Sequence, residues 1–253
     1  TDVPAGDIGT GAREIGYMFG QYKRIRNEWT GTLTGKGLSY GGSLARTEAT
    51  GFGLCYFTKE MLASKGESFE GKRVIISGSG NVGTYANKKT TQLGGKVVAQ
   101  SDVSGYIYDE NGIDYKIVEK IYQHRGLISE YLDYVPTAKF VEGPRNMWLD
   151  VKADVVLPCA TQNEIDEEAA KAIIANGAMA VAEGANMPNT PEAIKVYKNA
   201  GILYAPGKAS NAGGVATSGL EMTQNSERLS WTFDEVDAKL ESIMKNIYKS
   251  CVD

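Results

Sequence analysis

The chain has 253 residues, a formal net charge of -4, 42% hydrophobic and 23% charged residues, a composition ordinary for a soluble globular protein. This composition excludes disordered and fibrous classes, and the acidic balance argues against nucleic acid or an anionic membrane as the main partner. The sequence has no apolar run of about 18 residues and no signal-peptide pattern at its start, so we expect a cytoplasmic protein without a membrane span.

The cysteines and the single histidine exclude several kinds of site. Cys55, Cys159 and Cys251 lack the spacing of a disulfide framework or a zinc site, and we expect all three to be reduced and packed in the interior. His124 lies in a charged stretch, where we expect it at the surface. The sequence therefore predicts no metal site and no histidine-based catalysis.

Hydrophobic periodicity predicts alternating helices and strands along most of the chain. In chain order we expect a helix at 12–24, a glycine-rich loop at 30–43, a helix at 46–65, a strand at 73–77, a helix at 82–93, strands at 96–100, 139–141 and 154–157, a helix at 164–176, a strand at 178–182, a helix at 191–199 capped by Thr190, a strand at 202–204, a loop at 206–214 and helices at 215–228 and 233–251. Right-handed βαβ crossovers then give an α/β fold with an open, doubly wound, mostly parallel sheet.

The strongest motif follows the strand at 73–77. There the apolar residues lead directly into Gly78-Ser79-Gly80-Asn81-Val82-Gly83 and then a helix. In such a G-x-G-x-x-G loop the first glycine permits the tight turn, the second lets a pyrophosphate approach the backbone, and the third lets the helix pack on the strand. A purely structural glycine turn is the alternative, but strand, helix and Asp102 about 20 residues later fit the dinucleotide-binding, Rossmann-like motif.

Asp102 bears on which dinucleotide is bound. A carboxylate at this place suits the two ribose hydroxyls of NAD and repels the extra phosphate of NADP unless a nearby cation offsets it. Arg125 and the other basic residues of 119–125 are candidates for that cation, although a solvated helix face explains them equally well. These residues alone leave both cofactors open.

Six motifs in order give the chain a resemblance to the hexameric, NADP-type glutamate dehydrogenases over essentially its full length. They are PAGDIG at 4–9, TGK with GGSLARTEATG at 34–51, the fingerprint at 77–83, LPCATQNE at 157–164, AEGANMP at 182–188 and NAGGVATSGLEM at 211–222. The Ser-Gly-Ser-Gly-Asn-Val form of the fingerprint resembles the NADP-using branch, so we expect NADP, with NAD possible.

The resemblance assigns roles to individual residues. It implies that Asp7 is the catalytic acid/base, although capping of the following helix is the plainer role for this side chain. It implies that Val215 and Ser218 contact the substrate, where a hydroxyl suits the γ-carboxylate of glutamate. The cofactor-binding residues that it implies, together with those of the fingerprint, are Arg46, Thr50, Gly78, Ser79, Gly80, Asn81, Val82, Gly83, Asp102, Ala160, Thr161, Asn163 and Asn186.

The implied reaction is the reversible, NADP-dependent oxidative deamination of L-glutamate to 2-oxoglutarate and ammonia, in a homohexamer. The family's substrate lysines lie upstream of the PAGDIG motif and are absent here, so we expect a fragment that binds cofactor without turnover. We expect 1–40 to be a short remnant of the second, catalytic domain, 41–228 the dinucleotide-binding domain, and 229–253 a truncated C-terminal helix. A non-catalytic dinucleotide-binding regulator is the alternative, but it has no reason to keep Asp7, Thr50 and Ser218 together.

Overall fold

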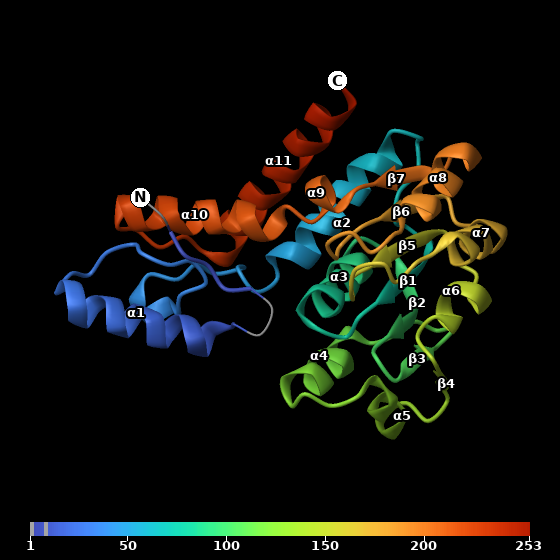
Figure 1. Cartoon of the computed structure of the whole chain (residues 1–253), viewed down its shortest axis with the longest axis horizontal. Coiled ribbons are helices and arrows are strands. Elements are labelled where there is room, and N and C mark those ends of the chain that lie inside the picture. Colours follow the sequence, from blue (N-terminus) through green and yellow to red (C-terminus); the bar gives the residue numbers. More distant parts are fainter. Residues whose placement is uncertain (1–2, 8–9) are drawn as a thin grey trace.

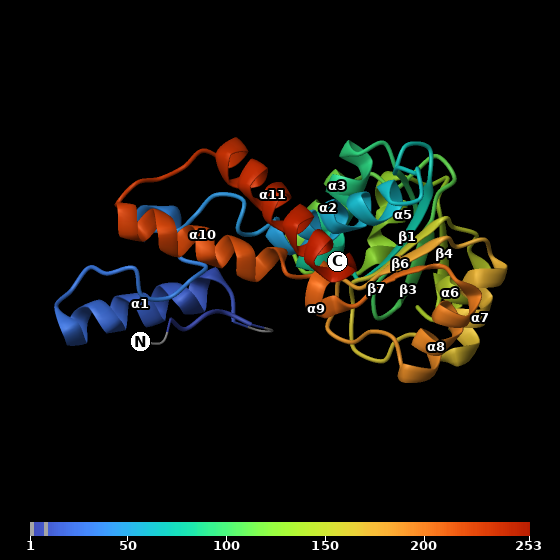
Figure 2. The same ribbon diagram turned by 90° about the horizontal axis from the view of Figure 1, so that it is seen from above.

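The computed structural model describes residues 3–7 and 10–253, which form a large α/β lobe and a smaller helical lobe beside it (Figure 1). Seen from above, α1 and α10 lie together at one end and the sheet lies at the other (Figure 2). The helices are α1 (Ala12–Arg26), α2 (Ala49–Ala63), α3 (Asn81–Gln92), α4 (Tyr115–Gln123), α5 (Tyr131–Tyr134), α6 (Asn146–Asp150), α7 (Glu167–Ala175), α8 (Pro191–Ala200), α9 (Gly207–Ser210), α10 (Gly213–Glu227) and α11 (Phe233–Val252), with 3-10 turns at Leu38–Tyr40 and Ile128–Glu130.

The sheet has seven strands in the order β4-β3-β2-β1-β5-β6-β7. They are β1 (Arg73–Ser77), β2 (Lys96–Ser101), β3 (Gly105–Tyr108), β4 (Lys139–Glu142), β5 (Val155–Pro158), β6 (Ala180–Ala182) and β7 (Leu203–Ala205). Strands β2, β1, β5, β6 and β7 pair in parallel. The expected doubly wound, mostly parallel α/β class is therefore confirmed.

One edge of the sheet differs from the prediction of βαβ crossovers throughout. Strand β3 was not predicted, and both β3 and β4 run antiparallel to their neighbours. The cause is a tight turn at 102–104, in which Asp102 Oδ1 accepts a hydrogen bond of 2.7 Å from the Ser104 amide. Three residues leave no room for a crossover helix, so the chain turns back as a hairpin.

The two faces of the sheet bury different side chains, as period-two alternation in a buried strand requires. Val74 and Ile76 of β1 face a core built with α2, α3 and α11, whereas Ile75 faces a core built with α6, α7 and α8. Among the almost fully buried side chains of the second core, that of Trp148 is the largest. The carboxyl ends of the parallel strands are thereby held in a fixed arrangement.

Several predicted boundaries were wrong for local reasons. The helix predicted from residue 46 begins at Ala49, because Ala45 has a φ of 59° and residues 44–48 form turns. The helix predicted from 164 begins at Glu167, where Asp166 accepts a hydrogen bond from the Ala169 amide at 2.9 Å. The helix predicted from 215 begins at Gly213, and the loop predicted at 206–214 contains α9.

Three smaller predictions concern a helix cap, the histidine and the cysteines. The Thr190 cap is confirmed, since its hydroxyl accepts from the Ala193 amide at 3.3 Å. His124 is confirmed as a surface residue, with 46% of its side chain exposed. All three cysteines are free thiols, but Cys251 is exposed at the end of α11, so its predicted packing in the interior was wrong.

Candidate functional site

The glycine-rich loop between β1 and α3 has the backbone that the fingerprint requires. Gly78 has a φ of 84°, and a Cβ there would lie 3.0 Å from the Cys159 carbonyl oxygen. A Cβ on Gly83 would lie 2.0 Å from the Gly78 carbonyl oxygen, so only glycine lets α3 pack this closely on the loop. A Cβ on Gly80 would meet nothing within 4 Å, which leaves the backbone of that residue open to a ligand.

Hydrogen bonds turn the carbonyl groups of this loop away from the open side. Gln100 Nε2 donates to the Gly78 carbonyl at 2.9 Å, and Thr84 Oγ1 donates to the Ser79 carbonyl at 3.1 Å. Helix α3 starts after Gly80 with no side-chain cap. Its first amide N–H groups and the positive end of its dipole therefore favour an anionic group such as a diphosphate.

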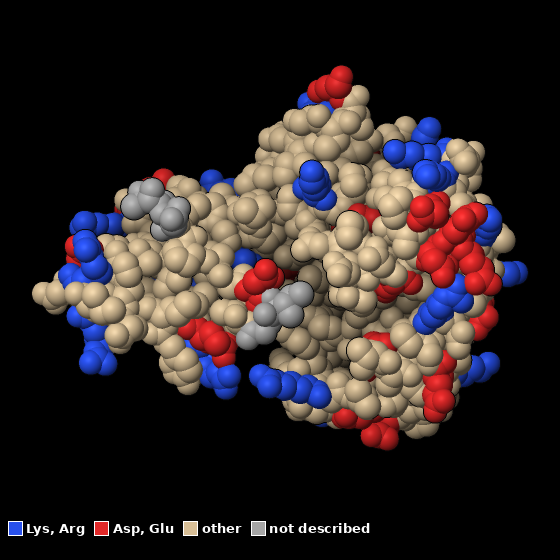
Figure 3. Space-filling model, in the orientation of Figure 1, with Lys and Arg blue, Asp and Glu red and all other residues tan. Residues whose placement is uncertain are grey.

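A hollow of about 570 Å³ lies against this loop at the carboxyl ends of β1, β2 and β5. Six predicted cofactor residues line it: Gly78, Ser79, Gly80, Asp102, Ala160 and Thr161. Open α/β sheets bind ligands at this edge. Figure 3 shows that the front face of the molecule is hollowed between the two lobes.

Asp102 follows β2 as predicted, but both of its carboxylate oxygens already accept hydrogen bonds from the chain. Oδ1 accepts from the Ser104 amide and hydroxyl at 2.7 and 2.5 Å, and Oδ2 accepts from the Ile128 amide at 2.7 Å. The carboxylate thus joins the β2–β3 turn to the segment 126–128, of which Gly126 and Leu127 line the hollow. Arg125, the candidate cation, is exposed and has a φ of 60°.

A second group of predicted residues meets where α10 crosses the start of α2. Arg46 Nε donates a hydrogen bond to Ser218 Oγ at 3.1 Å, and burial lowers the pKa of this guanidinium, an effect that Glu221 opposes. A Cβ on Gly214 would lie 2.6 Å from the Thr50 hydroxyl. Ser218 is 8% exposed, whereas Val215, one turn earlier, is 73% exposed.

The segment with Asp7 lies on the same side as α10. Ala5 forms a parallel bridge with Thr34, and the neighbouring Gly35 amide donates to Glu221 Oε2 at 2.9 Å. Glu221 lies three residues after Ser218 on α10, so these contacts bring the described part of the PAGDIG motif to that helix. Asp7 itself is exposed, and Ile8 and Gly9 of the motif lie outside the described residues.

The remaining predicted residues lie in loops between these two groups. Asn163 has a φ of 56°, and its amide donates to the Met187 carbonyl at 2.9 Å. Asn186 Oδ1 accepts a hydrogen bond from Asn211 Nδ2 at 2.8 Å. These bonds join the loops that follow β5, β6 and β7, which lead from the hollow toward α10. Asn81 and Val82 lie in the first turn of α3 and are half-buried.

The prediction from sequence missed two charged residues of the hollow, Glu164 and Arg145. Glu164 was placed at the start of a helix, where an acid is common, so nothing marked it as a half-buried residue of the hollow. Its Oε1 accepts from Ser77 Oγ at 2.8 Å, and burial raises its pKa to about 7. Arg145 forms exposed ion pairs with Asp166 and Glu168 at 2.8 and 2.7 Å, which no spacing in the sequence indicates.

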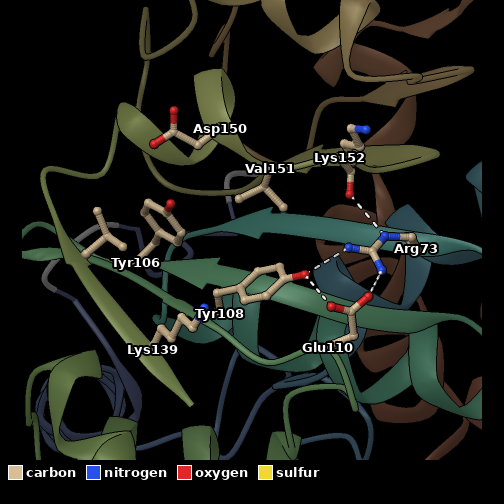
Figure 4. A pocket seen from close by; sticks show the side chains of 9 residues that line it. Arg73, Tyr106, Tyr108, Glu110, Lys139, Asp150, Val151 and Lys152 are labelled. Carbon is tan, nitrogen blue, oxygen red and sulfur yellow. Dashed lines mark hydrogen bonds and ion pairs between the residues drawn. The ribbon is translucent and has the colours of Figure 1, made fainter. Parts of the chain in front are cut away.

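A second hollow of about 600 Å³ lies over β3 and β4 (Figure 4). Arg73, one of the cations that line it, already has partners in the protein: it donates to Glu110 at 3.0 Å, to the Tyr108 hydroxyl at 3.2 Å and to the Lys152 carbonyl at 3.2 Å. The glycine loop and the carboxyl ends of the parallel strands do not contribute to it. We therefore take the hollow at the glycine loop as the candidate site.

Residues 3–7 and 10–253 offer neither a metal site of clustered ligands nor a membrane-spanning helix. Within these ranges no group of three or more His, Cys, Asp or Glu side chains is arranged to hold a metal ion. None of the helices described is both long and apolar enough to cross a membrane.

Comparison with known proteins gives consistent results. The family model for glutamate/leucine/phenylalanine/valine dehydrogenase matches residues 41–253. The chain is 60% identical to the NAD(P)-specific glutamate dehydrogenase of Xylanibacter ruminicola over 99% of its length, and 51% identical to the NADP-specific enzyme of Escherichia coli over 100%. It spans about 57% of the length of each of these relatives.

Solved structures agree with the sequence relatives. The crystal structure of Plasmodium falciparum glutamate dehydrogenase superposes with a TM-score of 0.95 at 48% identity, over 99% of this chain and 54% of that one. The hetero-hexameric glutamate dehydrogenase of Thermus thermophilus, at 24% identity and a TM-score of 0.88, shares the fold.

Proposed function

Since the chain belongs to the glutamate/leucine/phenylalanine/valine dehydrogenase family, we propose that it is the dinucleotide-binding part of a glutamate dehydrogenase. The reaction is the reversible, NADP-dependent oxidative deamination of L-glutamate to 2-oxoglutarate and ammonia. The observation that carries this proposal is the open backbone at Gly80, at the uncapped start of α3 and beside the hollow at the strand ends.

The residues of the hollow fit a dinucleotide. The amide groups at the start of α3 would hold the diphosphate, and the loops after β2 and β5, with Ala160 and Thr161, would flank it. Arg46 and Thr50 at the start of α2 would contact the nicotinamide end. The bound cofactor supplies the hydride chemistry, and the protein binds, orients and excludes water around it.

For the substrate we propose the region around Ser218. Its hydroxyl, held by Arg46 at 3.1 Å, is a donor for the γ-carboxylate of glutamate, and Val215 gives an apolar surface one helical turn away. Asp7 would exchange a proton with the amino nitrogen. Because Asp7 is exposed in this structure, the exclusion of water that favours such a role would come from closure of the site around the substrate.

For the cofactor we propose NADP over NAD. Relatives of both kinds are found, including an NAD-specific enzyme of Bacteroides fragilis at 54% identity. Two observations support NADP: the Ser-Gly-Ser-Gly-Asn-Val form of the fingerprint, and Asp102, whose two oxygens are bound by chain donors and are less available to ribose hydroxyls.

The assembly and activity of the intact protein follow from the same proposal. We propose a cytoplasmic homohexamer, and we expect this chain alone to bind cofactor without oxidising glutamate. A regulator that binds the dinucleotide without catalysis would use the glycine loop equally well. The position of Ser218, the proposed substrate residue, beside Arg46 and Thr50 favours the enzyme, because a protein that only binds the dinucleotide needs no substrate residue there.

Substitution at Gly80 tests the proposal. In Gly80→Ala the new methyl group occupies open space, so the fold should be unchanged, but it blocks the approach of the diphosphate. We expect the dissociation constant for NADPH to rise by about tenfold or more, a loss of about 1.4 kcal/mol, measured by the fluorescence of NADPH. Gly20→Ala on α1, also in open space, is the matched control. Unchanged affinity in Gly80→Ala would refute the proposed site.

A further inference from the structure

Glu164 occupies an unusual position at the candidate site. It comes after β5, outside any helix, and lines the hollow together with Gly78 and Gly80. Anion-binding sites favour donors and cations, so a half-buried carboxylate beside the place of a diphosphate opposes binding when it is ionised. The proposed function gives Glu164 no role.

The contacts of Glu164 connect it to both strands under the loop. Glu164 Oε1 accepts from Ser77 Oγ at 2.8 Å and from the Ala160 and Thr161 amides, both at 3.3 Å. Ser77 Oγ in turn accepts from the Cys159 and Ala160 amides at 2.9 and 3.2 Å. The carboxyl group thus orients the Ser77 hydroxyl. That hydroxyl, in the residue before Gly78, joins the end of β1 to the residues that follow β5.

Resting on the proposed function, we propose that Glu164 is a positioning residue that binds a proton when the dinucleotide binds, so that cofactor affinity falls as the pH rises. The neutral carboxyl group can still accept from Ser77 and keep the two strand ends together. The ionised group places a negative charge in the same hollow as the diphosphate, where partial burial leaves it less screened than in bulk water.

Burial raises the pKa of Glu164 to about 7, against the opposing hydrogen bonds from Ser77, Thr161 and Ala160. A like charge nearby raises it further, so the diphosphate favours the protonated form. Below pH 7 the carboxyl group of the free chain is already neutral, and the dinucleotide binds tightly. Above pH 7 binding also requires the uptake of a proton from solution, so the affinity falls.

The other titratable and charged groups around the hollow are Cys159, Asp102, and Arg145 with the two acids that it pairs. The Cys159 thiol, which contacts the same region, has its pKa raised by burial and stays neutral. Asp166 and Glu168 are paired with Arg145, and the pKa of Asp166 is lowered by its hydrogen bonds. Asp102 accepts three hydrogen bonds from the chain. The 2′-phosphate of NADP itself titrates near pH 6, as phosphate monoesters do, so NADH, which lacks it, is the primary probe.

The test measures NADH binding to the chain by fluorescence from pH 6 to pH 8, with NADPH in parallel. We expect the dissociation constant for NADH to rise about tenfold across this range, the result for one linked proton with a midpoint near 7. In Glu164→Gln, which keeps an acceptor for Ser77 but cannot ionise, we expect less than a twofold change. Glu167→Gln, an exposed acid on α7, is the matched control and should keep the wild-type slope.

Proton uptake gives a second readout that needs no variant. Calorimetry of NADH binding at pH 8 in buffers of different ionisation enthalpy should show nearly one proton taken up by the wild-type chain. Binding without a pH slope and without proton uptake would overturn the role of Glu164 and leave the proposed function standing. Failure of both dinucleotides to bind at any pH would overturn both. If Glu164→Gln does not fold, proton uptake by the wild type decides.

Discussion

Arg46 and Ser218 are 172 residues apart in sequence and share a hydrogen bond of 3.1 Å, from Nε to Oγ, where α2 begins and α10 crosses it. The sequence implied different ligands for them, the cofactor for one and the substrate for the other. Their contact brings those two proposed sites to one place, and it also joins α10 to the turn before α2.

Removal of the Ser218 hydroxyl should therefore cost stability. In Ser218→Ala the guanidinium of Arg46 loses its acceptor in a half-buried place, and a hydrogen bond to a charged group contributes about 1.5–3 kcal/mol. We expect the free energy of unfolding, from urea denaturation at pH 7, to fall by about 1–2 kcal/mol. Ser226→Ala on the same helix removes an exposed hydroxyl that bonds only the Met222 carbonyl, and should change less than about 0.5 kcal/mol. Equal effects would contradict a specific role for the contact.

The Lys36–Glu221 ion pair joins the loop after α1 to α10 and is fully buried, with 0% of either side chain exposed and 2.7 Å between Nζ and Oε1. Glu221 also accepts from the Gly35 and Lys36 amides, and Lys36 Nζ donates to the Leu33 carbonyl. Removing the Lys36 ammonium leaves the buried Glu221 carboxylate without its ion-pair partner. We expect Lys36→Met to lower the free energy of unfolding by about 3–5 kcal/mol.

An exposed pair of equal length provides the control for this prediction. Lys59 and Glu241 are also 2.7 Å apart, but their side chains are 43% and 40% exposed. We expect Lys59→Met to change stability by less than about 1 kcal/mol in the same urea titration. If Lys36→Met and Lys59→Met cost the same, burial does not determine the strength of the Lys36–Glu221 pair.

Asp102 permits a test of cofactor preference. Its carboxylate binds the Ser104 amide and hydroxyl and the Ile128 amide, so Asp102→Ala should loosen the wall of the hollow at 126–128. We expect the dissociation constants for NADH and NADPH to rise together, by about tenfold, with their ratio changed less than threefold. A loss confined to NADH would mean that the carboxylate reads the ribose hydroxyls directly.

The sequence predicted the elements that recur regularly and missed those that depend on local bonds. The glycine loop after β1 followed from its residues because each glycine has a separate steric reason that the structure bears out at Gly78 and Gly83. The β2–β3 hairpin did not, because it depends on Asp102 accepting bonds from Ser104 and Ile128, and no periodicity marks such contacts.

The same limit applies to the candidate site. Ala160 and Thr161 were expected at the candidate site because they follow a parallel strand, and open α/β sheets bind ligands at the carboxyl ends of such strands. Glu164, three residues after Thr161, was missed because burial of an acid depends on the packing of β1 against β5. Its position in the hollow follows from the structure, where it bonds Ser77.

The raised pKa of Glu164 also predicts how stability depends on pH. Its pKa rises from an ordinary value of 4.5 to about 7 because burial penalises the charged form. Below pH 4.5 the group is protonated in both folded and unfolded chains, and the fold pays no penalty. Between 4.5 and 7 the unfolded chain releases the proton first, so the free energy of unfolding falls with rising pH, by roughly 3 kcal/mol at most.

Glu164→Gln removes this penalty without removing the acceptor for Ser77. We expect Glu164→Gln to be more stable than the wild type, and its gain in the free energy of unfolding to be about 2 kcal/mol larger at pH 8 than at pH 5. Urea titrations at both pH values measure this difference. Glu167→Gln, whose carboxylate is exposed and paired with Lys171, should show no such difference. Were the advantage of Glu164→Gln equal at the two pH values, the carboxyl group would not titrate between them, and the proposed proton linkage to the dinucleotide would lose its physical basis.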